Sequence, residues 1–365
     1  MSPKPVRVLV VDDSALMRKV IPQILQTDNS IQVVGTAIDG NFGLKKIDEL
    51  RPQVITLDLE MPGMGGLDML KEIMRKHRLP VIVVSSHSTE GASVTLKALS
   101  LGAFDFVAKP TDVSNRMQEI ARDLISKIKA AAQSRGIQIQ QTIDLPLPTA
   151  RPRSKPGAPK EPTKLVAIGI STGGPQSLQY LLAQFPTDFP GSIVVVQHMP
   201  DGFTEMFARR LDECCSLHVK EAQSGDMLIA GRVLICPGSR HIKVKKLPLG
   251  DIAILSDDPR VNGHRPSADV MFKSVAEEFG SRAVGILMTG MGEDGANGLG
   301  QIKAAGGITV AQGEQSCIVF GMPKAAIERG HAMRVVELDA MANTIQALCR
   351  SGRDSAEKAM SAGQH

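Results

Sequence analysis

The chain has 365 residues, of which 42% are hydrophobic and 22% are charged, a length and composition that favour two globular domains. Aromatic residues make up only 3% and the net charge is +4, so we expect neither base stacking on nucleic acid nor a polyanionic partner. No segment approaches ~18 consecutive apolar residues and no signal peptide is recognisable, so we expect a cytoplasmic protein without membrane insertion.

The first part of the chain, from residue 6 to about residue 133, alternates short apolar segments with amphipathic ones. The amphipathic segments predict helices such as 16–25, in which Leu16, Val20, Ile24 and Leu25 share one face, and 67–74. The apolar segments predict strands at residues 7–11, 31–37, 54–57, 81–84 and 104–107. Five strands alternating with five helices predict a doubly wound parallel sheet, which binds ligands at the carboxyl ends of its strands.

Polar residues follow several of these strands. Asp12 and Asp13 end the first, Asp58 the third, Ser85 the fourth and Lys109 the fifth. Carboxylates gathered at one edge need a cation, and Mg²⁺ prefers such oxygen ligands. We therefore expect Mg²⁺ beside a carboxylate that accepts a phosphoryl group, with the ammonium and the hydroxyl responding to the phosphate. Each feature alone has a structural alternative, such as a helix cap for the Asp pair or a plain turn for Lys-Pro.

The segments VLVVDDS, TLDLEMPGMGGLDML, VIVVSS and GAFDFVAKP resemble the response-regulator receiver family over residues 6–125. The resemblance implies a flavodoxin-like fold and phosphotransfer from a sensor histidine kinase to Asp58. It also implies Mg²⁺ ligation by Asp12, Asp13 and Asp58, switch roles for Ser85 and Lys109, and a cis peptide bond after Lys109.

Residues 134–163 break the alternation, because six prolines occur there together with several basic residues. Such a composition predicts a semi-extended linker that has no core of its own. We therefore expect a receiver domain at 5–125, a helical extension and linker at 126–163, a second domain at 164–352 and a polar, frayed tail at 353–365.

The alternation resumes at residue 165 and predicts a second α/β domain. Strands are expected at 165–170, 193–196, 284–288 and 308–311, a two-stranded excursion at 242–244 and 252–255, and helices up to 185, at 204–214 and at 298–305. Glycine-rich loops follow three of these strands, and parallel strands would bring such loops together.

The first loop places Ser171 in a G-x-S-x-G segment between strand and helix. This spacing suits an exposed nucleophile, but it also suits a phosphate-binding loop or a plain helix cap. His198 follows the next strand and could take the serine proton. An acid must then orient the histidine, and the spacing leaves Asp294, Glu293, Asp269, Asp258 and Asp257 as alternatives.

Backbone N–H groups of the third loop, for instance those of Met291 or Gly292, could face an oxyanion. The order serine, histidine, acid differs from that of the α/β-hydrolases. A nucleotide-binding output and a non-catalytic interaction module remain alternatives, whereas a DNA-binding output is not expected, since no basic recognition helix follows the linker.

The segments AIGISTGG, VVVQHMP and TGMGEDGANGL resemble the catalytic domain of the chemotaxis protein-glutamate methylesterase family over residues 165–350. The resemblance implies a Rossmann-like α/β domain in which Ser171 is the nucleophile, His198 the base and Asp294 the orienting acid. It places the Met291 N–H, with that of Thr172, in the oxyanion hole. It implies ester hydrolysis and glutamine deamidation on chemoreceptor helices without a cofactor, and a receiver that covers the esterase site until Asp58 is phosphorylated.

Overall fold

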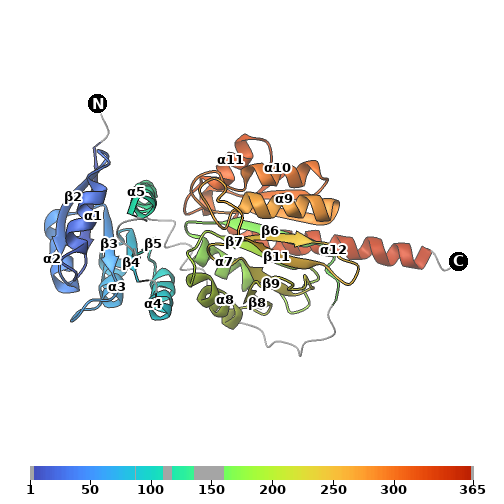
Figure 1. Ribbon diagram of the computed structural model, residues 1–365, viewed down its shortest axis with the longest axis horizontal. Helices are drawn as coiled ribbons and strands as arrows, with labels where there is room; N and C mark the ends of the chain where they lie inside the picture. The colour runs from blue at the N-terminus through green and yellow to red at the C-terminus, as the bar shows by residue number, and fades with distance from the viewer. Residues whose placement is uncertain (1–3, 87, 110–116, 135–159, 363–365) are drawn as a thin grey trace. The chain divides into compact units, whose positions relative to one another are not determined.

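A computed structural model describes residues 4–86, 88–109, 117–134 and 160–362; side chains are not described at residues 89, 117–119 and 351–362. The chain separates into two compact units, divided after Leu145. Each unit is an α/β domain built on a parallel sheet (Figure 1), as the sequence predicts. The expected linker at 134–163 lies largely outside the described residues.

The first unit contains a five-stranded sheet in the order β2-β1-β3-β4-β5, with every neighbouring pair parallel. This is the flavodoxin-like order, which places the ends of β1, β3 and β5 around one edge. The strands are β1 (Val6–Val11), β2 (Ile31–Ala37), β3 (Val54–Asp58), β4 (Val81–Ser85) and β5 (Asp105–Ala108). The helices are α1 (Met17–Leu25), α2 (Gly40–Leu50), α3 (Gly66–Lys76), α4 (Thr89–Ser100) and α5 (Met117–Gln133).

One residue of the predicted first helix is misplaced. Ile24 and Leu25 are buried as expected, but the helix begins at Met17 and the side chain of Leu16 is 58% exposed. Leu16 occupies the N-cap position, before the face of the helix turns toward the sheet. The predicted helix therefore begins one residue too early, and the placement of Leu16 on its buried face is wrong.

The second unit contains a seven-stranded sheet in the order β14-β13-β12-β6-β7-β9-β8, again entirely parallel. Its strands are β6 (Leu165–Ile170), β7 (Ser192–Gln197), β8 (His218–Glu221), β9 (Arg232–Ile235), β12 (Ala283–Leu287), β13 (Ile308–Gln312) and β14 (Arg334–Val336). The central strands β6, β7 and β12 are buried along their whole length, which is why they read as continuous apolar runs.

Helices cover both faces of this sheet. In Figure 1, α9, α10 and α11 lie on one side, and α7 and α8 on the other. The helices are α7 (Gly174–Leu182), α8 (Phe203–Cys214), α9 (Ala268–Phe279), α10 (Ala296–Ala304), α11 (Met322–Glu328) and α12 (Leu338–Ala362). The expected excursion is an antiparallel pair, β10 (His241–Lys245) and β11 (Ile252–Ser256). The backbone of α12 continues to Ala362, whereas the sequence led us to expect a frayed segment there.

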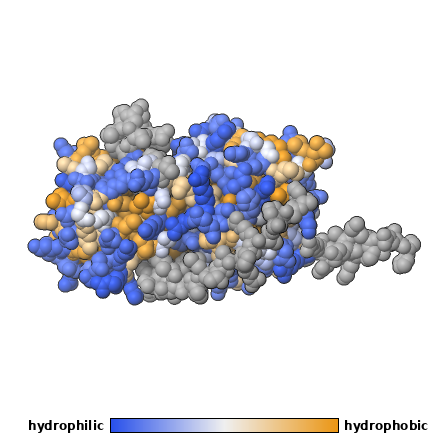
Figure 2. All heavy atoms as spheres, turned by 90° about the horizontal axis from the view of Figure 1, so that it is seen from below, coloured by the Kyte–Doolittle hydropathy of each residue, from blue (hydrophilic) through white to orange (hydrophobic). Residues whose placement is uncertain are grey.

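The face seen in Figure 2 carries both hydrophilic and hydrophobic patches. Among the described residues, no helix is long and apolar enough to cross a membrane. Each unit has its own buried hydrophobic core. Polar residues are rarely buried in such cores, so the buried polar residues are candidates for function.

Candidate functional site

Three acidic side chains meet at the carboxyl edge of the first sheet. Asp12 and Asp13 follow β1 and Asp58 ends β3, and one carboxylate oxygen from each lies within 4.8 Å of the others. The Nζ of Lys109, just after β5, lies 2.6 Å from Oδ2 of Asp58 and 3.8 Å from Oδ2 of Asp12. The structure thus brings together four of the five residues predicted for the receiver site.

The charges in this cluster are not balanced. Asp12 and Asp58 are buried, and within the described part of the chain the Oδ2 of Asp12 has no hydrogen-bond partner. Burial raises the pKa of Asp12 to about 6, although the charge of Lys109 opposes the rise. Burial also raises the pKa of Asp58, against the hydrogen bond from Lys109. An oxygen-lined site with an orphaned buried carboxylate oxygen fits a divalent cation such as Mg²⁺.

The raised pKa of Asp12 gives a stability prediction. Between pH 3.8 and about 6 the folded state holds a proton that the unfolded state has released, so the free energy of unfolding falls as the pH rises through this window. Without Mg²⁺, Asp12→Asn should therefore stabilise the first unit at pH 7.5, by on the order of 1 kcal/mol, but not at pH 4. Urea unfolding at the two pH values measures the difference. Asp13→Asn is the control, since Asp13 is exposed; an equal gain at both pH values would contradict the assignment.

The hydroxyl of Ser85 is hydrogen-bonded to α4. It accepts a hydrogen bond from Oγ1 of Thr95 (2.6 Å) and donates to the carbonyl of Gly91 (3.2 Å), both in α4. The backbone of Lys109 is nevertheless tied to that of Ser85, because the Lys109 N–H donates to the Ser85 carbonyl at 2.6 Å. The predicted movement of Ser85 towards a phosphate therefore requires the hydroxyl to leave α4. The expected cis bond after Lys109 lies outside the described residues.

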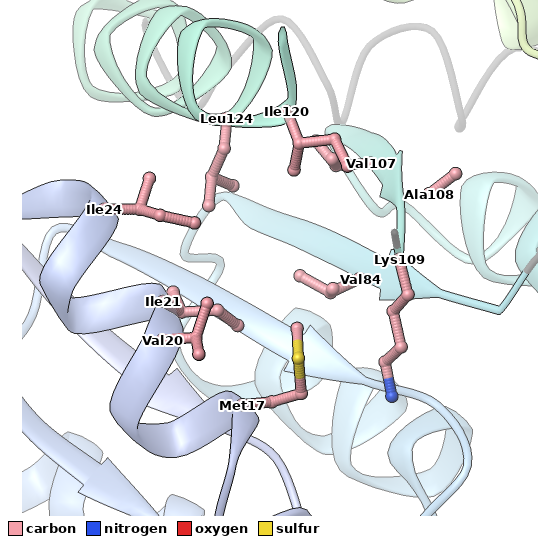
Figure 3. Close-up of a pocket in the computed structure, with 10 residues that line it drawn as sticks. All are labelled: Met17, Val20, Ile21, Ile24, Val84, Val107, Ala108, Lys109, Ile120 and Leu124. Atoms are coloured by element: carbon pink, nitrogen blue, oxygen red, sulfur yellow. The ribbon is translucent and has the colours of Figure 1, made fainter. Parts of the chain in front are cut away.

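An apolar pocket lies beside Lys109 (Figure 3). Side chains of α1 and α5 form two of its walls, and Val84, Val107 and Ala108 at the ends of β4 and β5 complete it. The ammonium of Lys109 reaches past this apolar lining to the carboxylates. The lining of the pocket is therefore apolar apart from Lys109, and the charged groups lie at the sheet edge where the carboxylates meet.

In the second unit, the loops after β6, β7 and β12 meet at the carboxyl edge of three adjacent strands. The winding of the chain reverses between β6 and β12, which is the place where open α/β sheets bind ligands. The Ser171 N–H donates to the Thr289 carbonyl at 2.9 Å, and the His198 N–H donates to the Ile170 carbonyl at 3.1 Å. A β-carbon on Gly290 would lie 2.7 Å from that of Ser171, so this close approach requires glycine.

Ser171 does not cap the helix that follows it. The N-cap of α7 is Gly173, at a φ of 75°, and no side chain caps this end. Among the described residues no hydrogen bond engages the hydroxyl of Ser171, which is half-buried. A phosphate-binding loop is also disfavoured, because the side chain of Gln197 fills the space beside Gly174: a β-carbon there would lie 2.0 Å from its Oε1. The cap alternative is therefore wrong, whereas the role of Ser171 as a nucleophile stays a prediction.

His198 pairs with Asp294, which the geometry selects from the five candidate acids. Nε2 of His198 lies 2.8 Å from Oδ2 of Asp294, and both side chains are largely buried. Each of the four other candidate acids contacts residues other than His198. Asp257 pairs with Arg240, Asp258 with Lys243 and Glu293 with Arg329, whereas Asp269 accepts from Asn262 and from the Gly298 N–H.

Asp294 is held as an anion. Burial opposes its ionisation, but the hydrogen bond and charge of His198, together with hydrogen bonds from Ser267 and Asn262, keep the pKa of Asp294 well below its usual range. Its Oδ1 accepts from Oγ of Ser267 (2.7 Å) and Nδ2 of Asn262 (3.0 Å), and its Oδ2 accepts from the Ala268 N–H (2.6 Å). A carboxylate fixed in this way suits orientation of an imidazole, and not proton transfer of its own.

The two ring nitrogens of His198 have different surroundings. Nε2 donates to Asp294 in the neutral tautomer, so Nδ1 is the basic nitrogen. Nδ1 is buried and has no hydrogen-bond partner within the described residues. A buried acceptor without a partner is costly, and it is expected where a substrate or a reacting group completes the site.

Two backbone N–H groups near Ser171 are also unused. In the described part of the chain, the N–H groups of Thr172 and Met291 make no hydrogen bond. The carbonyls next to them are occupied: that of Thr172 accepts from Oγ1 of Thr289, and that of Gly290 accepts from the Gly321 and Met322 N–H groups. The loops are thus fixed while two donors stay available, as an oxyanion hole requires.

Sequence reasoning missed the turn at residues 261–264. Its Asn262 contacts Asp294, and the ring of His264 stacks on that of His198. The dipeptide Asn262–Gly263 is a strong signal for a tight turn, and it could have located the turn. Its position over His198, however, depends on tertiary structure.

Each of the two units matches a known protein family. The family model for the response regulator receiver domain matches residues 8–121, and that for the CheB methylesterase matches residues 166–345. A protein-glutamate methylesterase/protein-glutamine glutaminase of Koribacter versatilis is 59% identical over 93% of this chain and 95% of its own length. One from Pyrococcus horikoshii is 44% identical over 94% and 93%.

A solved structure resembles the second unit. The CheB methylesterase catalytic domain of Thermotoga maritima matches with a TM-score of 0.50 and 40% identity, and the match covers 51% of this chain and 98% of that one. Because relatives well above 30% identity match along nearly the whole chain, the family is established. The chain belongs to the protein-glutamate methylesterase/protein-glutamine glutaminase family, hydrolases that carry a response regulator receiver domain.

Proposed function

We propose that this chain hydrolyses the γ-methyl esters of glutamate residues on chemoreceptor helices, and that it also deamidates glutamine there. The observation that carries the proposal is the buried His198–Asp294 pair, which lies at the same edge of the sheet as the loop that begins with Ser171. The glutamate ester and the glutamine come from the names of the relatives, and the chemoreceptor comes from the family resemblance of the sequence. An acyl-transfer site does not by itself identify which ester or amide it accepts. We place the reaction in the cytoplasm and expect no cofactor for it.

In the proposed reaction, Oγ of Ser171 attacks the ester carbonyl carbon while Nδ1 of His198 takes its proton. The charge on the carbonyl oxygen falls beside the N–H groups of Thr172 and Met291, and Asp294 stabilises the imidazolium. The imidazolium returns the proton to the leaving methoxide, which departs as methanol and leaves an acyl-enzyme. Water, activated by His198, then releases glutamate. With a glutamine side chain the leaving group is ammonia.

The receiver unit would control this activity. A sensor histidine kinase is the expected phosphodonor, and Asp58 would accept the phosphoryl group as an acyl phosphate. Asp12, Asp13 and Asp58 would hold Mg²⁺, which supplies positive charge for the incoming phosphate. Lys109 already donates to Asp58, so it would transfer that hydrogen bond to the phosphate oxygens, and Ser85 would leave α4 to join it.

The test of the proposed function is methanol release from a methylated chemoreceptor, with and without a small phosphodonor and Mg²⁺. Release that rises with the phosphodonor, together with conversion of receptor glutamine to glutamate, is the expected result. Free nucleotide that bound tightly to a chain unable to release methanol would instead favour the nucleotide-binding alternative.

A serine-directed fluorophosphonate should label Ser171, because only an activated hydroxyl reacts with it; absence of labelling would favour a non-catalytic module.

A further inference from the structure

The turn at residues 261–264 packs directly against the catalytic pair. The turn is closed by two backbone hydrogen bonds, from the Val261 N–H to the His264 carbonyl (3.1 Å) and from the His264 N–H to the Val261 carbonyl (2.9 Å). Asn262 and Gly263 both have positive φ, 53° and 80°, the conformation of a tight hairpin turn that Asn-Gly favours. The turn therefore has a defined conformation, which sets the directions of the side chains of Asn262 and His264.

One of these side chains stacks on His198. The rings of His264 and His198 are parallel within 5°, and their centroids lie 4.0 Å apart. The other side chain bridges two acids, since Nδ2 of Asn262 donates to Oδ1 of Asp294 (3.0 Å) and to Oδ2 of Asp269 (2.7 Å). Asp269 in turn accepts from the Gly298 N–H (2.6 Å), at the start of α10. The turn thus contacts both members of the catalytic pair and is anchored to two helices.

A hydrogen bond alone does not fix the imidazole of His198. The bond from Nε2 to Asp294 fixes one point of the ring and leaves it free to rock about the line through that bond. The stacked ring removes this freedom, because rocking would drive the edge of one ring into the face of the other. The basic Nδ1 is then held at one direction, and general-base catalysis is sensitive to such direction.

We infer that His264 is a positioning residue, which fixes the plane of the His198 ring and so the direction in which Nδ1 can take a proton, and that Asn262 holds Asp294 for the same purpose. The inference rests on the proposed function, since it takes Ser171, His198 and Asp294 to be the reacting set. The role assigned to His264 is orientation, through the contact between its ring and that of His198.

The test compares His264→Ala with His264→Phe in the full chain, with phosphodonor present. Loss of the stack should lower kcat for methyl ester hydrolysis and the rate at which a fluorophosphonate labels Ser171, each about 10- to 100-fold, with KM nearly unchanged. Phe retains a flat ring and should restore both rates to within about 3-fold of the parent. Asn262→Gly, which keeps the turn and removes the amide, should give a smaller loss in the same two rates.

A merely structural role would instead lower the thermal stability of both His264 variants without separating their rates. The inference is overturned if His264→Ala labels and turns over at the parental rates, or if folded His264→Phe is as slow as folded His264→Ala. Failure of the proposed function has another signature: Ser171→Ala would keep full turnover in the parental background, and the positioning role would fall with it.

Discussion

Replacing Ser171 with Ala is expected to lower kcat for methyl ester hydrolysis by a factor on the order of 10⁴ to 10⁶, and His198→Ala should lower it about as much. The double variant should be little slower than either single variant, because a nucleophile and its base act as one unit. Once one of them is missing, the other no longer contributes to catalysis. Methanol release from methylated receptor, measured for all three variants at saturating phosphodonor, gives the comparison.

Two matched controls separate chemistry from folding. Ser177 lies on α7, only six positions further along the chain, and its buried hydroxyl has no hydrogen-bond partner among the described residues, so Ser177→Ala should keep parental activity. His218 is an exposed histidine that pairs with Asp212, and His218→Ala should also be neutral. If Ser171→Ala retained substantial turnover, or if the two single losses multiplied in the double variant, the triad assignment would be wrong.

The second large effect is expected at Asp58. With Mg²⁺ and a small phosphodonor, the parent chain should take up one base-labile phosphate and release methanol faster, by about 10-fold or more. Asp58→Asn should take up none and stay at the basal rate, because the amide cannot form an acyl phosphate. Chelation of the divalent ion should abolish uptake in the parent, since three carboxylates and one ammonium leave negative charge uncompensated at this edge.

The control for Asp58 is Asp68→Asn on α3, an exposed aspartate in an ion pair with Lys71. It should leave both uptake and activation unchanged. Phosphate uptake that survived Asp58→Asn would place the modified residue elsewhere. Uptake at Asp58 without any change in methanol release would retain the phosphorylation site and contradict its control of the esterase.

Much of the fold follows from short-range patterns in the sequence. The strand at 165–170 is found with the predicted bounds, because a strand buried on both faces must be apolar along its length. The strand at 31–37 also has the predicted bounds, although β2 is an edge strand in which only Ile31 and Ala37 are buried. Polar residues at the carboxyl ends of parallel strands, such as Asp58 and Lys109 in the first unit and Ser171 in the second, are brought to one edge of their own sheet by the parallel topology. Leu16 shows the limit of this reasoning, since periodicity places a face on a helix without fixing where the helix begins.

What the sequence by itself determined is the class of each domain and the residues that could react, because these depend on local burial patterns and on motifs within single loops. Spacing left five acids as possible partners of His198, and only the family resemblance implied Asp294; the contact itself depends on the tertiary structure, because the loop after β12 brings Asp294, 96 residues away, to Nε2. The same holds for His264, whose stacking on His198 depends on where a tight turn lies in space. Contacts between distant loops depend on how the elements pack together, and no local period of the sequence records that packing.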